Sequence, residues 1–113
     1  AKHKQAISSA MEALNLKLFA DNKSLSPAVT AIETKNFNAD DFRKIIKEKF
    51  DILLAGGQDH LKGKIFRIGH LGYINDKDII SVISAISYVL LDQNRVTADQ
   101  AGMAISEAKK HLN

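Results

Sequence analysis

One arginine stands out among the residues of this chain that could do chemistry. Arg67 lies in a short, otherwise apolar stretch, residues 65–68, directly before Gly69. A glycine beside a strand lets backbone or ligand approach closely, so Arg67 could have a ligand-binding role. The alternative is an arginine on the solvent face of an edge strand, paired with a local acid. Spacing alone favours this alternative without deciding between the two.

Other chemistries have weaker support in the sequence. The four histidines form no pair at i, i+4 on an expected helix, so no metal site is predicted at His3, His60, His70 or His111. Asp59 and His60 are adjacent, but a nucleophilic triad also needs a serine on a strained turn, and no Gly-x-Ser-x-Gly motif occurs. The glycines match no Walker or dinucleotide-binding loop. No residue of this chain is therefore predicted to be catalytic.

Composition limits the class of protein further. The 113 residues are 45% hydrophobic and 26% charged, which is typical of one globular domain spanning residues 1–113. With no cysteine, the chain has no thiolate for zinc, an iron–sulfur cluster or redox chemistry. A net charge of +3, with acids and bases evenly mixed, does not favour a nucleic-acid or membrane-surface partner. The longest near-apolar run is too short to cross a bilayer, and no signal-peptide core occurs, so a cytoplasmic protein is expected.

Hydrophobic periodicity predicts four helices and a small sheet. Apolar positions recur at helical spacing in residues 4–14, 38–49, 75–90 and 97–112. Strand patterns occupy residues 28–32, 50–55 and 64–69, and a short extended piece is expected at 16–19. Because two of these strands form a hairpin, the sequence favours an α+β fold, with a mostly antiparallel sheet covered by helices on one face.

Residues at the ends of these segments support the boundaries. Asn38 and Asn75 are expected N-caps, each followed by acids in the first helical turn. Thr97 and Gln100 have the spacing of a capping box, and Asn15 tolerates the left-handed conformation that ends a helix. The single proline, Pro27, is expected at a strand entry because it lacks an N–H group.

Residues 54–73 carry a resemblance to a known family. The motif Ala-Gly-Gly-Gln at residues 55–58, paired with Gly-Lys-x-x-Arg-Ile-Gly-His at residues 63–70, resembles the C-terminal domain of class V aminotransferases. These are fold type I pyridoxal-phosphate enzymes of the alanine–glyoxylate, serine–glyoxylate and serine–pyruvate group. Residues 25–32 are similar to the family's small-domain strand, and the resemblance covers nearly the whole chain. Some relatives carry the label of a soluble hydrogenase small subunit.

The resemblance implies roles for particular residues. The arginine of the family's Arg-Ile-Gly motif binds the substrate's α-carboxylate, a role that falls on Arg67 and reverses the preference drawn from spacing. Gly56, Gly57 and Gln58 would form a loop at the mouth of the site, although a plain hairpin turn fits them equally well. His70 and Tyr73 would lie near the site or pack the domain.

The resemblance also implies what lies outside these residues. The lysine that holds the cofactor, the acid at its pyridinium nitrogen and the phosphate donors lie in the family's large domain, which would precede residue 1. We therefore expect the C-terminal part of a longer, homodimeric enzyme that exchanges an amino group between alanine or serine and glyoxylate or pyruvate. The isolated chain is expected to be inactive. The alternative is a non-catalytic interaction module, or a subunit of a complex of the soluble hydrogenase type.

Overall fold

A four-stranded antiparallel sheet and four helices make up the fold. The computed structural model describes residues 2–19, 29–69 and 74–112. The helices are α1 (Lys2–Ala13), α2 (Ala39–Phe50), α3 (Asp76–Asp92) and α4 (Ala98–Lys110), with a short 3-10 helix, η1 (Asp59–Leu61). The strands are β1 (Lys17–Leu18), β2 (Val29–Glu33), β3 (Ala55–Gly56) and β4 (Ile65–Gly69), in the order β1-β2-β4-β3. The predicted α+β class is confirmed.

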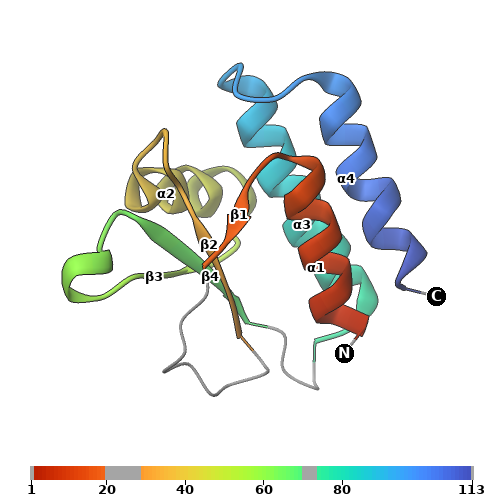
Figure 1. The fold of residues 1–113 in the computed structure, drawn as a ribbon, viewed down its shortest axis with the longest axis horizontal. Helices are drawn as coiled ribbons and strands as arrows, with labels where there is room; N and C mark the ends of the chain where they lie inside the picture. The colour runs from red at the N-terminus through yellow and green to blue at the C-terminus, as the bar shows by residue number, and fades with distance from the viewer. Residues whose placement is uncertain (1, 20–28, 70–73, 113) are drawn as a thin grey trace.

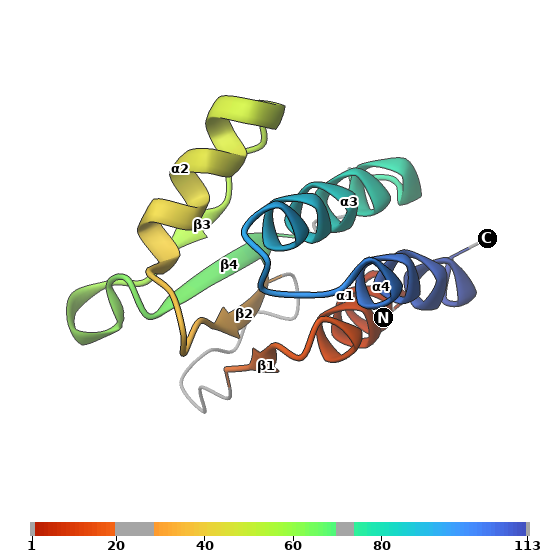
Figure 2. The same ribbon diagram turned by 90° about the horizontal axis from the view of Figure 1, so that it is seen from above.

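The helices cover one face of the sheet and leave the other face without a helix among the described residues. Figure 1 shows the sheet below α2 and beside α1, α3 and α4, and Figure 2 shows the same elements from above. Strand residues alternate between the two faces. Ile32 of β2 pairs with Phe66 of β4, and both are fully buried beneath the helices. One hydrophobic core therefore joins the sheet to the helical layer.

The predicted helix ends are present. Asn38 accepts a hydrogen bond from the backbone N–H of Asp41 at 2.9 Å, and Asn75 accepts one from Asp78 at 2.9 Å. Thr97 and Gln100 form the expected capping box. Asn15 follows α1 with φ of 60°, the left-handed conformation expected there. These local signals therefore mark the helix starts correctly.

The prediction of a strand over residues 50–55 is wrong in its extent. Phe50 is the last residue of α2, and Asp51 ends that helix in the left-handed conformation with φ of 56°. Strand pairing begins only at Ala55 and ends at Gly56. Apolar content misled the prediction, because Leu53 is 81% exposed and only Leu54 is buried in the core. Pro27 and Ala28 lie outside the described residues, so the expected strand entry there stays a prediction.

Small residues let the two terminal helices pack closely. Ala101, Ala104 and Ala108 line the buried side of α4, which lies against α1 and α3. The buried side of α1 includes Ala6 and Ala10. The first and last helices thus share one core and lie side by side in both ribbon views (Figures 1 and 2). In the parts of the chain that the structure describes, no helix has the length and apolar character to cross a membrane.

Candidate functional site

Arg67 lies on an interior strand of the sheet. β4 is flanked by β2 on one side and β3 on the other, so the interpretation of Arg67 as an edge-strand residue is wrong. Its direct cross-strand neighbours are Ala31 on β2 and Ala55 on β3. Both neighbours carry only a methyl group, so the long arginine side chain stands between two short ones.

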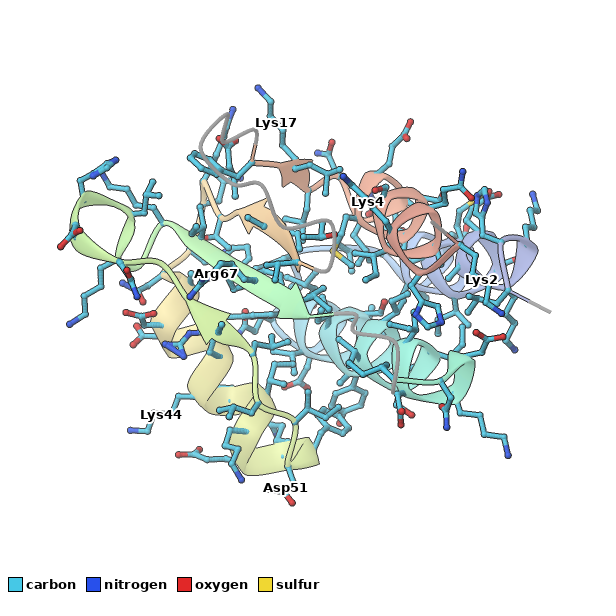
Figure 3. The ribbon with its side chains drawn as sticks, turned by 90° about the horizontal axis from the view of Figure 1, so that it is seen from below. Lys2, Lys4, Lys17, Lys44, Asp51 and Arg67 are labelled. Carbon is cyan, nitrogen blue, oxygen red and sulfur yellow. The ribbon has the colours of Figure 1, made fainter. Side chains whose placement is uncertain are left out.

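The Arg67 side chain lies on the sheet face that carries no helix. Residues 66 and 68 of β4 are buried toward the helices, and alternation along the strand places Arg67 on the opposite face. Figure 3 looks onto that face from below and shows Arg67 on the side of the sheet turned toward the viewer. The residue is half-buried. A ligand or a second domain can therefore reach it from this side.

A backbone carbonyl fixes one edge of the Arg67 guanidinium. Its Nε donates a hydrogen bond to the carbonyl oxygen of Gly56 on β3 at 2.9 Å. Within residues 2–19, 29–69 and 74–112 Arg67 forms no ion pair, and its Nη1 and Nη2 donate to no other atom. Since the Nε–H already donates to Gly56, the two terminal nitrogens remain available to donate hydrogen bonds to the two oxygens of a carboxylate.

Glu33 is the acid that the strand register places nearest to Arg67 on the same face. It lies on β2, two residues beyond Ala31, so it is a diagonal cross-strand neighbour of Arg67. The two do not pair, and the Oε2 atom of Glu33 is buried without a hydrogen-bond partner among the residues that the structure describes. The bond to Gly56 explains this arrangement, because it draws the guanidinium toward β3 and away from β2.

Neighbouring atoms lie close to both glycines that follow Leu54. A Cβ on Gly57 would lie 2.4 Å from the backbone oxygen of Leu61, and a Cβ on Gly56 would lie 2.6 Å from Nη2 of Arg43. Gln58 is exposed, and its carbonyl accepts the N–H of Leu61 at 2.9 Å to close η1. The residues thus form a tight connection between β3 and β4. Only Gly56 touches Arg67, through its carbonyl, and a role at the mouth of a site stays a prediction for Gly57 and Gln58.

His70 and Tyr73 lie outside the described residues, so their predicted place near the site is untested. Gly69, where a close approach was expected, ends β4 opposite Val29 and is exposed. Among the described residues, nothing lies within 4 Å of the position that a Cβ would take there. The close approach of a ligand to this strand end stays a prediction.

Sequence reasoning missed a second arginine, Arg43 on α2. Its Nε and Nη2 donate to Oδ1 of Asp40 at 3.3 and 3.1 Å, and its Nη1 donates to the carbonyl of Leu54 at 3.2 Å. The i, i+3 spacing of acid and arginine at the start of a helix was a readable signal for the first contact. Nothing local in the sequence indicates that Arg43 also reaches the backbone just before β3.

The histidines that the structure describes have structural partners or lie on the surface. His3 lies 3.0 Å from Oδ1 of Asp76, which ties α1 to α3. His111 contacts Oγ of Ser9 at 3.0 Å, which ties α4 to α1. His60 is exposed on η1. Over the described residues, no three metal-ligating side chains gather into a group that could hold an ion.

The described residues do not fit a binding site for pyridoxal phosphate. That cofactor needs a lysine for its imine, an acid at its ring nitrogen and donors for its phosphate. Every lysine in the described part of the chain is exposed, including Lys62 and Lys64 before β4. None of them lies in a pocket beside such groups, so these residues offer a site for a carboxylate but not for the cofactor.

Comparison with known proteins identifies the family to which this fold is similar. The chain is 53% identical over 91 residues to the soluble hydrogenase 42 kDa subunit of Anabaena cylindrica, covering 80% of this chain and 24% of that protein. It is 32% identical over 108 residues to the (S)-ureidoglycine–glyoxylate transaminase of Bacillus subtilis, covering 94% of this chain and 26% of that protein. No family model matches the chain.

Solved structures show the same arrangement. The ureidoglycine–glyoxylate aminotransferase of Bacillus subtilis superposes with a TM-score of 0.82 at 28% identity, covering 96% of this chain and 29% of that one. The pyridoxamine–pyruvate aminotransferase of Mesorhizobium loti gives a TM-score of 0.84 at 23% identity, a likeness of fold alone. The resemblance to the small domain of class V aminotransferases is confirmed. The chain spans about a quarter of the length of the curated relatives it matches.

Proposed function

We propose that the chain acts as the small domain of an aminotransferase and that Arg67 binds the carboxylate of the amino-acid and oxo-acid substrates. One observation carries this proposal. Arg67 lies on the sheet face that no described helix covers, with its Nε fixed by Gly56, while its two terminal nitrogens have no partner among the described residues. A half-buried cation held in this way is suited to an anion that arrives from outside the domain.

The proposed role follows from the chemistry of the guanidinium. Two parallel hydrogen bonds to one carboxylate fix the plane of the substrate as well as its position. Hydrogen bonds to charged groups contribute about 1.5–3 kcal/mol each, so two of them supply roughly 3–6 kcal/mol. This chain thereby orients the substrate, while the cofactor and the groups that move protons belong to residues outside it.

The proposal extends to the complete protein. We propose that a large domain, absent from this chain, holds pyridoxal 5'-phosphate, and that the intact enzyme is a cytoplasmic homodimer. The proposed substrates are alanine or serine as the amino donor and glyoxylate or pyruvate as the acceptor. Support comes from relatives whose names include a serine–glyoxylate aminotransferase, 30% identical over 71 residues, and an L-aspartate–glyoxylate aminotransferase, 32% identical over 107 residues.

The test is an Arg67→Ala substitution in the complete protein. The concentration of amino acid and of oxo acid needed for half-maximal rate should rise by a factor of roughly 100 or more, because several kcal/mol of carboxylate binding is lost. The absorbance of bound cofactor should stay unchanged. Arg95→Ala is the matched control, since Arg95 packs on Phe37 and bonds to Gln93 and Asn36 away from the open face. Unchanged substrate dependence in Arg67→Ala would rule out the role.

A second candidate function rests on the names of two relatives. The soluble hydrogenase 42 kDa subunit and the soluble hydrogenase small subunit of a Synechococcus strain are 53% and 52% identical to the chain. On this candidate the domain is a non-catalytic module within a complex. The two candidate functions are distinguished by purifying the complete protein and assaying it for transamination and for bound partner subunits. Transamination of alanine with glyoxylate supports the enzyme, whereas a stable complex with redox subunits and no transamination supports the module.

A further inference from the structure

The short strand β3 is held from two sides by two arginines. On one side, Nε of Arg67 donates to the Gly56 carbonyl at 2.9 Å. On the other side, α2 supplies Arg43, whose Nη1 donates to the carbonyl of Leu54 at 3.2 Å, immediately before the strand. The same guanidinium is held by Asp40 through Nε and Nη2. The backbone that fixes Arg67 is therefore itself fixed by an ion pair on α2.

The Arg43 guanidinium lies against Gly56. A Cβ built on this glycine would lie 2.6 Å from Nη2, 2.9 Å from Cζ and 3.0 Å from Nε of Arg43. Three atoms of one planar group at nearly equal distances place that group flat over the residue. Gly56 consequently has Arg43 packed on its helix-facing side, and its carbonyl oxygen accepts the hydrogen bond from Arg67.

Strand β3 needs such support because it has little of its own. It consists of two residues at the edge of the sheet and pairs only with β4. Leu54, directly before it, is buried in the core, but Ala55 is exposed and Gly56 carries no side chain, so neither strand residue adds a buried side chain. Short edge segments with few buried contacts open locally at low free-energy cost. Movement of β3 would carry the Gly56 carbonyl away from the Arg67 guanidinium.

We propose that Arg43 is a positioning residue for substrate binding, acting through β3 and the Gly56 carbonyl on Arg67. This inference rests on the proposed function of Arg67. Arg43 does not touch the substrate, because it lies on the side of β3 that faces α2. Its side chain and that of Asp40 are only 28% and 27% exposed, so the pair is partly shielded from solvent and keeps a defined geometry.

The first test measures the hydrogen bond between Arg67 Nε and the Gly56 carbonyl directly in the 113-residue chain. Hydrogen exchange of the Arg67 Nε–H, followed by NMR, should be slowed in the native chain and at least tenfold faster in Arg43→Ala. Arg95→Ala should leave it unchanged. If Arg43→Ala does not fold, Arg43→Lys serves instead, because it retains the charge facing Asp40 but lacks the planar fork that reaches Leu54. Native-like exchange in a folded Arg43 variant would overturn the proposal.

The second test is a double-mutant cycle in the complete protein. Arg43→Ala should raise the KM for alanine several-fold with little change in bound cofactor, and it should have no further effect in an Arg67→Ala background. A purely structural role predicts the same loss in both backgrounds and would contradict the proposal. If Arg67→Ala itself leaves KM unchanged, the proposed function fails. The exchange measurement still reports whether Arg43 fixes Arg67.

Discussion

Arg67 is accessible because its cross-strand neighbours are small. Ala31 and Ala55 flank it directly, and Glu33, the diagonal acid, does not reach it. Within the described part of the chain, Arg67 is held only by a backbone carbonyl. A guanidinium without an ion pair keeps its full charge available to a ligand, whereas an ion-paired one must first exchange its partner. The neighbours of Arg67 therefore determine whether its guanidinium is free to bind an anion.

Replacing Ala31 with glutamate tests this reasoning. Ala31→Glu places a carboxylate directly opposite Arg67, where opposite charges on paired strands attract. The new pair should compete with substrate and raise the KM for alanine about tenfold or more, which corresponds to about 1.4 kcal/mol. Ala31→Gln is the isosteric control without charge. Equal KM values for the two variants would show that the guanidinium does not contact the space above residue 31.

At the scale of elements, sequence reasoning succeeded where the signal was local. The N-caps at Asn38 and Asn75 depend on residues within one turn, so their positions could be predicted. Residues 50–55 were wrongly assigned to a strand. An apolar run looks the same whether it forms a strand or, as here, the end of a helix followed by an exposed residue such as Leu53. The two-residue strand β3 arises from pairing with β4 and from the contact of Arg43 with Leu54, which are 11 residues apart, beyond the reach of a pattern within one helical turn.

The connection between β3 and β4 gives a prediction about stability. Gly57→Ala should lower the free energy of unfolding by about 1–3 kcal/mol, because its methyl group would meet the Leu61 backbone, which cannot turn aside as a side chain can. Gly102→Ala is the contrasting variant. Gly102 is exposed in α4 with open space around it, so this substitution should raise the free energy of unfolding by about 0.5–1 kcal/mol. Urea unfolding measures both, and a neutral Gly57→Ala would contradict the packing described.

The end of α2 gives a prediction about pH. The hydrogen bond and charge of Lys47 hold the pKa of Asp51 below its ordinary value of 3.8. A carboxyl whose pKa is lowered by folding stabilises the native state above the unfolded pKa and loses that contribution as pH falls through the folded one. Asp51→Asn keeps a residue that tolerates the left-handed conformation. This variant should be less stable than the native chain at pH 7. The difference should shrink as the pH falls below 3.8 and disappear below the lower pKa of the folded state; a difference independent of pH would contradict this.

At the scale of the whole molecule, the order of the strands determines whether Arg67 lies on an edge strand or on an interior strand. Periodicity predicted a mostly antiparallel sheet under helices, and this is the observed class. It could not predict that β3 would lie outside β4, because strand order depends on pairing between segments far apart in the chain. The edge-strand interpretation failed for this reason. The resemblance to a family, by contrast, pointed to the arginine on the face that no described helix covers.

The open face of the sheet is where the rest of a larger protein would meet this domain. The chain spans about a quarter of its curated relatives, and its helices already share a core with each other and with the opposite sheet face. A domain that closes over Arg67 would exclude water from the carboxylate and strengthen its hydrogen bonds. On the proposed function, the small domain would supply orientation and the remainder of the protein would supply the reacting groups.

The most direct test of the central claim compares alanine with ethylamine, which is the same amine without the carboxylate. In the complete protein, the rate at which each donor converts the bound cofactor is measured by absorbance, for the native protein and for Arg67→Ala. The account predicts that the substitution slows alanine by a factor of roughly 100 or more and leaves ethylamine nearly unchanged, so that most of the preference for alanine is lost. Equal slowing of both donors, or none of either, would show that Arg67 does not bind the carboxylate.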